Sequence, residues 1–142
     1  MKKLMMMTVL GASLAFVACG QKLDASKVPA VVKASFAKEY PGISPKWEKE
    51  NGNYEVNFKK DGNTMSLLIQ PNGSIVETEM DIKIGDLPAT VLAYVKEHYP
   101  GKNIKEAAKI TKADRSVNYE AEVNGKDVIF DANGKFIKEA KD

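Results

Sequence analysis

Carboxylates spaced two residues apart are the side chains of this sequence that come closest to a chemical site. Glu77 and Glu79 form one such pair, and Glu120 and Glu122 form another. Residues i and i+2 of a strand project from the same face, so either pair could bind calcium or share the acid and base roles of a hydrolysis. A solvated sheet face with interspersed lysines explains the same spacing, and we expect this second interpretation.

Histidine and cysteine offer little further chemistry. His98 is the only histidine and Cys19 the only cysteine, so a site that needs a second histidine, a thiol pair for zinc, or an internal disulfide is impossible. His98 also falls where a matching upstream helix carries Glu39, which indicates a surface position. Every glycine belongs to the leader, a turn or a link, so no phosphate loop follows a strand. We predict no catalytic residue, cofactor or metal ligand, and a protein that is not an enzyme.

The first 18 residues indicate export. Two lysines precede an uncharged apolar run from Leu4 to Val17, which is the pattern of a secretory signal peptide and is short for a membrane span. Ala18 followed by Cys19 resembles the cleavage site of bacterial lipoproteins, although Phe16 departs from the usual aliphatic residue. The resemblance implies acylation of Cys19 and a lipid anchor. The expected location is the outer membrane, with the protein facing the periplasm or exposed on the cell surface. An ordinary signal peptide with a chance cysteine is the alternative.

Loss of this leader also changes the charge balance. The whole chain has 21 Lys and Arg against 19 Asp and Glu, and removing Lys2 and Lys3 leaves 19 residues of each sign. A neutral, sign-mixed chain has no electrostatic footprint for nucleic acid. The remaining 124 residues, 142 less the 18 of the leader, suit one domain of ordinary size.

Two stretches, residues 28–42 and 87–101, repeat one another at a spacing of 59 residues, with seven identical positions. Each begins with Pro-Ala and ends with Tyr-Pro-Gly, which predicts a helix that opens at proline and closes before Pro-Gly. In these helices Tyr40 and Tyr99 are expected to plug the helix end against a sheet. In the first helix, one apolar face is expected from Val28, Val31, Val32, Ser35, Phe36 and Tyr40.

After each helix the hydrophobic period changes from 3.6 to 2, as expected of strands. Asn-Gly and Asp-Gly dipeptides divide the remainder of each half into hairpins. The predicted strands lie around Trp47 and at 53–60, 63–70 and 74–81 in the first half, and at 104–111, 117–123, 128–131 and 136–140 in the second half.

The chain is therefore divided into a signal peptide at 1–18, a polar tether at 19–27, a first repeat at 28–82 and a second at 83–142. Each repeat of about 60 residues would be marginal alone, so we expect the two to share one core or one sheet. The fold class is α+β, with two tandem units of a helix and a four-stranded antiparallel meander.

Paired Pro-Ala to Tyr-Pro-Gly helices, each followed by a Tyr-Glu strand and an Asn-Gly turn, behind a lipoprotein signal, resemble the PepSY-like, β-lactamase-inhibitor-like family of Bacteroidetes envelope lipoproteins. The resemblance implies one extended antiparallel sheet with helices on one face and an open face that can hold a partner. Two features depart from the known inhibitor, which has a disulfide in each repeat and an aromatic-rich concave face. The aromatics of this chain fall mostly on the helix-facing side of the alternation.

The expected function is binding of another envelope or exported protein, with inhibition or modulation of an exported hydrolase as one form of it. The alternative is a small-ligand or metal-ion binding module that uses the open polar face. Candidate contacts are Glu55, Glu120 and Glu122 on that face and Asp61 at a hairpin tip. Trp47 is a further candidate because tryptophan is enriched at interfaces, with core packing as its alternative.

Overall fold

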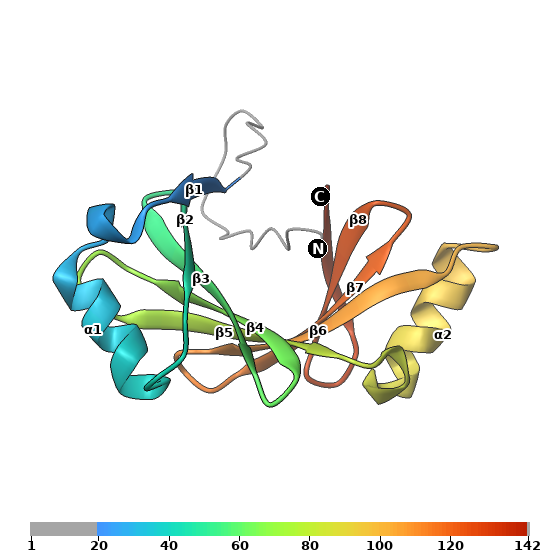
Figure 1. Cartoon of the computed structure of the whole chain (residues 1–142). Coiled ribbons are helices and arrows are strands. Elements are labelled where there is room, and N and C mark those ends of the chain that lie inside the picture. Colours follow the sequence, from blue (N-terminus) through green and yellow to red (C-terminus); the bar gives the residue numbers. More distant parts are fainter. Residues whose placement is uncertain (1–19, 142) are drawn as a thin grey trace.

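The computed structural model describes residues 20–141, which form one nine-stranded antiparallel sheet and two helices (Figure 1). Neighbouring strands in the sheet are also neighbours in the chain, from β1 to β9. The strands are β1 (Gln21–Leu23), β2 (Lys46–Glu50), β3 (Asn53–Lys60), β4 (Asn63–Ile69), β5 (Ile75–Ile82), β6 (Ile104–Lys112), β7 (Val117–Val123), β8 (Lys126–Asp131) and β9 (Phe136–Lys141). The helices are α1 (Ala30–Glu39) and α2 (Ala89–His98), each preceded by a 3-10 turn, η1 (Ala25–Lys27) and η2 (Ile84–Asp86).

Both helices begin and end as the Pro-Ala and Tyr-Pro-Gly signals predict. Pro29 and Pro88 stand just before the first helical residue, one position earlier than expected. Tyr40 follows α1 and donates its backbone N–H to the Phe36 carbonyl at 2.9 Å, and Tyr99 ends α2 in the same way. None of the helices within residues 20–141 has the length and apolar character needed to cross a membrane.

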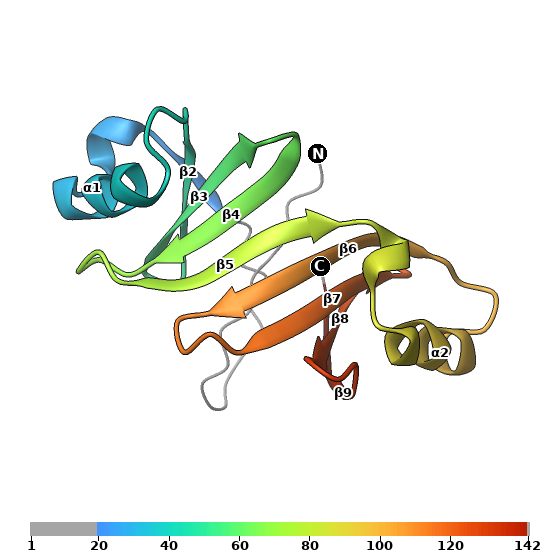
Figure 2. The same ribbon diagram turned by 90° about the horizontal axis from the view of Figure 1, so that it is seen from below.

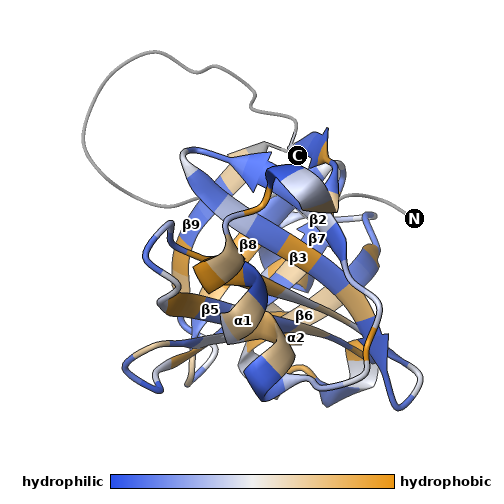
Figure 3. Cartoon of the chain, turned by 60° about the vertical axis from the view of Figure 1, so that its left-hand side comes forward, coloured by the Kyte–Doolittle hydropathy of each residue, from blue (hydrophilic) through white to orange (hydrophobic). Residues whose placement is uncertain are grey.

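Each helix covers its own half of the sheet, and the two halves have separate cores. Val32 and Phe36 of α1 pack against Val56 and its neighbours, while Val91 and Val95 of α2 pack against the second half. Hydrophilic and hydrophobic residues alternate along the strands, so that one side of each strand joins a core (Figure 3). The predicted α1 face was too wide, because Val31 is 48 % exposed. The repeats thus share a sheet but not a helix-side core.

The two halves are joined where β5 pairs with β6. Six residue pairs run from Glu77 opposite Lys112 to Ile82 opposite Ala107, without a break in register. A third apolar cluster, Leu68, Ile110 and Ile129, lies on the face opposite the helices and draws its members from both halves. The sheet is therefore continuous across the repeat boundary (Figure 2).

Most of the segment predicted as a polar tether, residues 19–27, has regular secondary structure. It contains β1 and η1, and Leu23 pairs with Trp47 and packs against the first core. The side chain of Asp24 accepts the Ser26 backbone N–H at 2.8 Å and so caps the turn. A short polar segment lacked a visible strand signal because pairing with the free edge of β2, a tertiary contact, is what makes it a strand. Cys19 and the leader lie outside the described residues.

Candidate binding face

One face of the sheet carries no helix and is dominated by carboxylates. The first and last strands rise on either side of the middle strands, and both helices lie on the outer flanks (Figure 1). We call the helix-free side the acidic face. By strand register its carboxylates are Glu48, Glu50, Glu55, Glu77, Glu79, Asp81, Glu106, Glu120, Glu122, Asp127 and Asp131. By the same register its lysines are Lys22, Lys46, Lys59, Lys112 and Lys138.

The repeat boundary brings carboxylates of both halves together. Asp81 of β5 and Glu120 of β7 are both opposite Ala108 of β6, whose side chain is a single methyl group. Glu79 is next to Ile110 in the adjacent row. Because β6 places apolar residues here, the carboxylates on either side of it face one another with no lysine between them.

Glu79 lies at the centre of this arrangement and is 2 % exposed. Its burial raises the pKa of the carboxyl well above the ordinary value, and the negative charges of Glu120 and then Glu55 raise the pKa further. Asp81 and Asp127 act in the same direction. The face therefore favours the protonated form of Glu79 until a positive charge approaches.

Glu50, at the end of β2, is a second buried acid on this face. It is 4 % exposed, and its Oε1 has no hydrogen-bond partner. Burial, together with the charges of Glu48 and Glu77, raises the pKa of Glu50 to about 7. A buried acceptor without a donor lowers the free energy of unfolding by about 1–3 kcal/mol. The described residues supply no donor to Glu50 Oε1.

The lysines of the face offset only part of this charge. Burial raises the pKa of Glu77, while Lys112 and Lys138 oppose that shift. Lys46, Lys59 and Lys112 are exposed, whereas most of the central carboxylates are buried. The positive groups of the face are therefore the more exposed ones, and the negative groups the more buried ones.

The carboxylate pairs singled out in the sequence do share this face. Within residues 20–141, however, no three His, Cys, Asp or Glu side chains are grouped so as to hold a metal ion.

The candidate contact residues divide between the two faces. Glu55, Glu120 and Glu122 are on the acidic face, but they are 4 %, 3 % and 2 % exposed, so the expectation of a solvated face is wrong for them. Alternation along a strand gives the face of each residue but not its burial. Asp61 is exposed at the β3–β4 turn, as expected for a hairpin tip.

Trp47 faces the other way, into the first core. It is 5 % exposed, and its ring meets the Phe36 ring edge-on with centroids 5.8 Å apart. This is the core alternative given for Trp47, and it leaves the indole no surface to offer a partner. His98 is exposed, as expected, and stacks on Tyr94 at a centroid distance of 3.9 Å.

Sequence reasoning missed Glu50 and Asp127 as members of the face. Asp127 alternates with Val128 and could have been found from the period-2 pattern. Glu50 stands beside an Asn-Gly turn, where the pattern suggests an exposed residue, and only the fold shows it buried.

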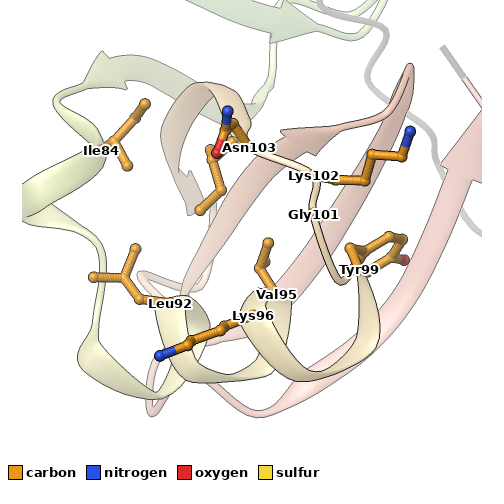
Figure 4. Close-up of a pocket in the computed structure, with 9 residues that line it drawn as sticks. Ile84, Leu92, Val95, Lys96, Tyr99, Gly101, Lys102 and Asn103 are labelled. Carbon is orange, nitrogen blue, oxygen red and sulfur yellow. The ribbon is translucent and has the colours of Figure 1, made fainter.

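Two hollows lie away from the centre of the acidic face. The larger, about 500 Å³, lies beside α2, and Leu92, Val95 and Tyr99 line it together with Lys96 and Lys102 (Figure 4). The smaller, about 350 Å³, lies between the β3–β4 turn and the end of β5. Of the carboxylates of the acidic face, Asp81 lines the smaller hollow and none lines the larger.

Two helix-and-four-strand units on one sheet define a tandem α+β repeat protein. A family model described as "Putative beta-lactamase-inhibitor-like, PepSY-like" matches residues 17–77 and again residues 70–138. The chain belongs to this PepSY-like family, which confirms both the resemblance and the fold class drawn from the sequence. None of the curated proteins compared with the chain matches it.

Solved structures of Bacteroides proteins share the fold. A protein of Bacteroides eggerthii described as "putative periplasmic" is 15 % identical with a TM-score of 0.72, over 80 % of this chain and 88 % of its own. A DUF2874 family protein of Bacteroides uniformis is 18 % identical with a TM-score of 0.70, and the match covers 80 % of this chain and 88 % of that protein. A BLIP-like protein of Bacteroides fragilis is 22 % identical with a TM-score of 0.63, and the match covers 80 % of this chain and 85 % of that protein. At these identities the likeness concerns the fold.

Proposed function

We propose that this protein is a non-enzymatic, lipid-anchored envelope protein that binds another exported protein through the acidic face. An exported hydrolase, inhibited or modulated by occupation of its groove, is the class of partner that the family description suggests. The exposed β3–β4 tip with Asp61 is a second contact region.

The observation that carries the proposal is the one-sided covering of the sheet. α1 and α2 both pack on the outer flank, so strands of both repeats present one continuous surface on the other side (Figure 1). A rigid sheet held by backbone pairing can meet a partner without rearrangement.

The anchor and the envelope location rest on the sequence. The leader and the Ala18-Cys19 junction support export and acylation of Cys19. The description of the Bacteroides eggerthii structure as periplasmic agrees with a periplasmic location for this chain. Retention of the mature protein in the membrane fraction, and its loss from that fraction in a Cys19→Ser variant, would test the anchor.

Site-specific photo-crosslinking of the full-length lipoprotein in intact cells tests the binding face. A photoreactive residue is placed at Asn118 or Lys59 on the acidic face, and at Lys33 on α1 as the matched control. We expect adducts with one exported protein from the two face positions only. Equal adducts from Lys33, or none from any position, would contradict the proposal. A captured hydrolase is then assayed with and without the purified protein.

A further inference from the structure

We infer that the occupant of the acidic face is a lysine- and arginine-rich segment of the partner protein. This inference rests on the proposed function and adds the chemistry of the partner. Charge is distributed unevenly over the molecule. The mature chain is electrically balanced, with 19 residues of each sign, yet the acidic face has eleven carboxylates against five lysines. The field over this face is negative although the chain as a whole is neutral, and it attracts cations.

Glu50 is the second, independent sign of a cationic ligand. Its side chain is 4 % exposed, its Oε1 has no donor, and the charges that act on it, from Glu48 and Glu77, are both negative. A guanidinium or ammonium group would supply the missing N–H and balance the neighbouring charges at the same time. A neutral donor would satisfy Oε1 but leave the repulsion in place.

The floor of the face is apolar and buried. Leu68, Ile110 and Ile129, which are 2 %, 5 % and 8 % exposed, form a cluster between the carboxylates, on the side opposite the helices. Low-polarity surroundings strengthen the attraction between a carboxylate and a cation placed beside it. An apolar floor surrounded by acids therefore favours a cationic group, and residues 20–141 contain no cluster of ligands for a bare metal ion.

The binding should depend on pH in a definite direction. Glu79 and Glu50 have raised pKa values because burial and neighbouring carboxylates disfavour their charged forms. The groups that bear on Glu79 are Glu120, Glu55, Asp81 and Asp127, and those on Glu50 are Glu48 and Glu77, the last also influenced by Lys112 and Lys138. A cationic ligand binds the deprotonated face, so its affinity should rise with pH through 7, and protons should be released on binding.

Calorimetry with the mature protein tests this inference. The probe is a synthetic peptide of ten residues in which lysine and arginine alternate with serine, and the comparison peptide has glutamine in place of each basic residue. We expect binding of the basic peptide alone at an ionic strength of about 20 mM, weakened at least about tenfold at about 200 mM because salt screens charge pairs. Proton release is read from the dependence of the heat on the buffer.

Two double variants that each replace two carboxyl groups locate the binding. Glu79→Gln with Glu120→Gln replaces two carboxyl groups of the acidic face, and Glu39→Gln with Glu97→Gln replaces two at exposed helix positions. We expect the first to weaken binding at least about tenfold and the second to change it less than about twofold. Circular dichroism checks folding, and the single variant Glu50→Gln, which replaces a destabilised charge, repeats the test if the double variant does not fold.

Other results would overturn the inference. Equal binding of the glutamine peptide, or equal weakening by the two double variants, would show that neither charge nor this face recognises the ligand. Stabilisation by calcium alone, without peptide binding, would favour the metal-ion alternative. If crosslinks form on the face but the basic peptide does not bind, the proposed protein-binding function stands and the inference of a basic partner segment is wrong. If crosslinks also fail to form, the proposed function and the inference are both wrong.

Discussion

At the scale of single residues, the acidic face shows how burial changes what a carboxylate does. Glu39 on α1 and Glu50 on β2 are the same residue type, yet the first is exposed and the second is 4 % exposed with Oε1 unpaired. The two residues differ in their place in the fold, since one ends a helix and the other ends a strand of the sheet. A buried carboxyl that lacks a donor lowers stability.

Glu50→Gln tests this at neutral pH. The pKa of Glu50 is raised from 4.5 to about 7 in the folded protein, so the folded state holds the proton more tightly than the unfolded state. The free energy of unfolding therefore falls as pH rises from about 4.5 to 7. We expect Glu50→Gln to be about 1–2 kcal/mol more stable than the parent at pH 8, after allowance for solvent near the sheet edge, and nearly equal to it at pH 4.5.

Urea titrations at pH 8 and pH 4.5 measure the free energy of unfolding of Glu50→Gln and of the parent. Glu39→Gln is the control, and it should leave the free energy of unfolding unchanged at both pH values. A Glu50→Gln variant that is less stable than the parent at pH 8 would mean that the carboxylate is stabilised by a partner.

At the scale of elements, each half of the molecule clamps a hairpin turn onto its helix. Ser35 Oγ of α1 donates to the Gly73 carbonyl at 2.7 Å, and Thr90 Oγ1 of α2 donates to the Asn133 carbonyl at 2.9 Å. The two hydroxyls are not at matching positions of the repeat, because Thr90 corresponds to Val31. The duplicated fold has kept the clamp while changing the residue that makes it.

Gly134→Ala should break the second clamp. Gly134 has φ +77°, and an added Cβ would meet the Thr90 side chain and approach Pro88 Cβ to 3.2 Å. Backbone strain and this clash together should cost about 2–3 kcal/mol of unfolding free energy. Gly125→Ala is the matched control, because φ is +73° there but no atom lies within 4 Å of the added Cβ, and about 1 kcal/mol is expected.

Thermal and urea unfolding of the two variants give the comparison. Equal losses for Gly134→Ala and Gly125→Ala would show that the helix contact contributes nothing beyond the backbone conformation.

At the scale of the whole molecule, two cores are joined through one sheet. The helix-side cores do not touch, so the coupling between halves runs through the β5–β6 pairing and the cluster of Leu68, Ile110 and Ile129. Because this cluster draws on both repeats, opening one half exposes apolar surface of the other. We expect the two halves to unfold together.

The single tryptophan makes this measurable, because Trp47 reports on the first core only. Val128→Ala in the second core, at a fully buried site, should cost about 2 kcal/mol. In a cooperative molecule the urea midpoint seen by Trp47 fluorescence shifts as far as the midpoint seen by circular dichroism. Two separate midpoints, with the fluorescence midpoint unmoved, would show that the repeats unfold independently. Val56→Ala, beside Trp47, is the control that shifts both signals in either case.

Much of the architecture is dictated by local sequence. Pro-Ala and Tyr-Pro-Gly place both helices, because proline and glycine restrict the backbone within a residue or two. Alternation and Xaa-Gly turns predict eight of the nine strands, and the seven with stated bounds agree with the structure within two residues, since a strand with one buried face needs period 2. The same alternation correctly assigns Glu55, Glu120 and Glu122 to the face without helices.

Tertiary structure decided the rest, because it depends on contacts between residues far apart in the chain. β1 is a strand only because the edge of β2 is free to pair with it. Ala108 matters only because β5 and β7 flank it with Asp81 and Glu120. The fold buries Glu79 and Glu50, two members of an alternating and apparently solvated set of acids, and thereby raises their pKa values. Thus local patterns determined the elements and the side of the sheet that each residue occupies, while long-range packing determined the electrostatics of the face.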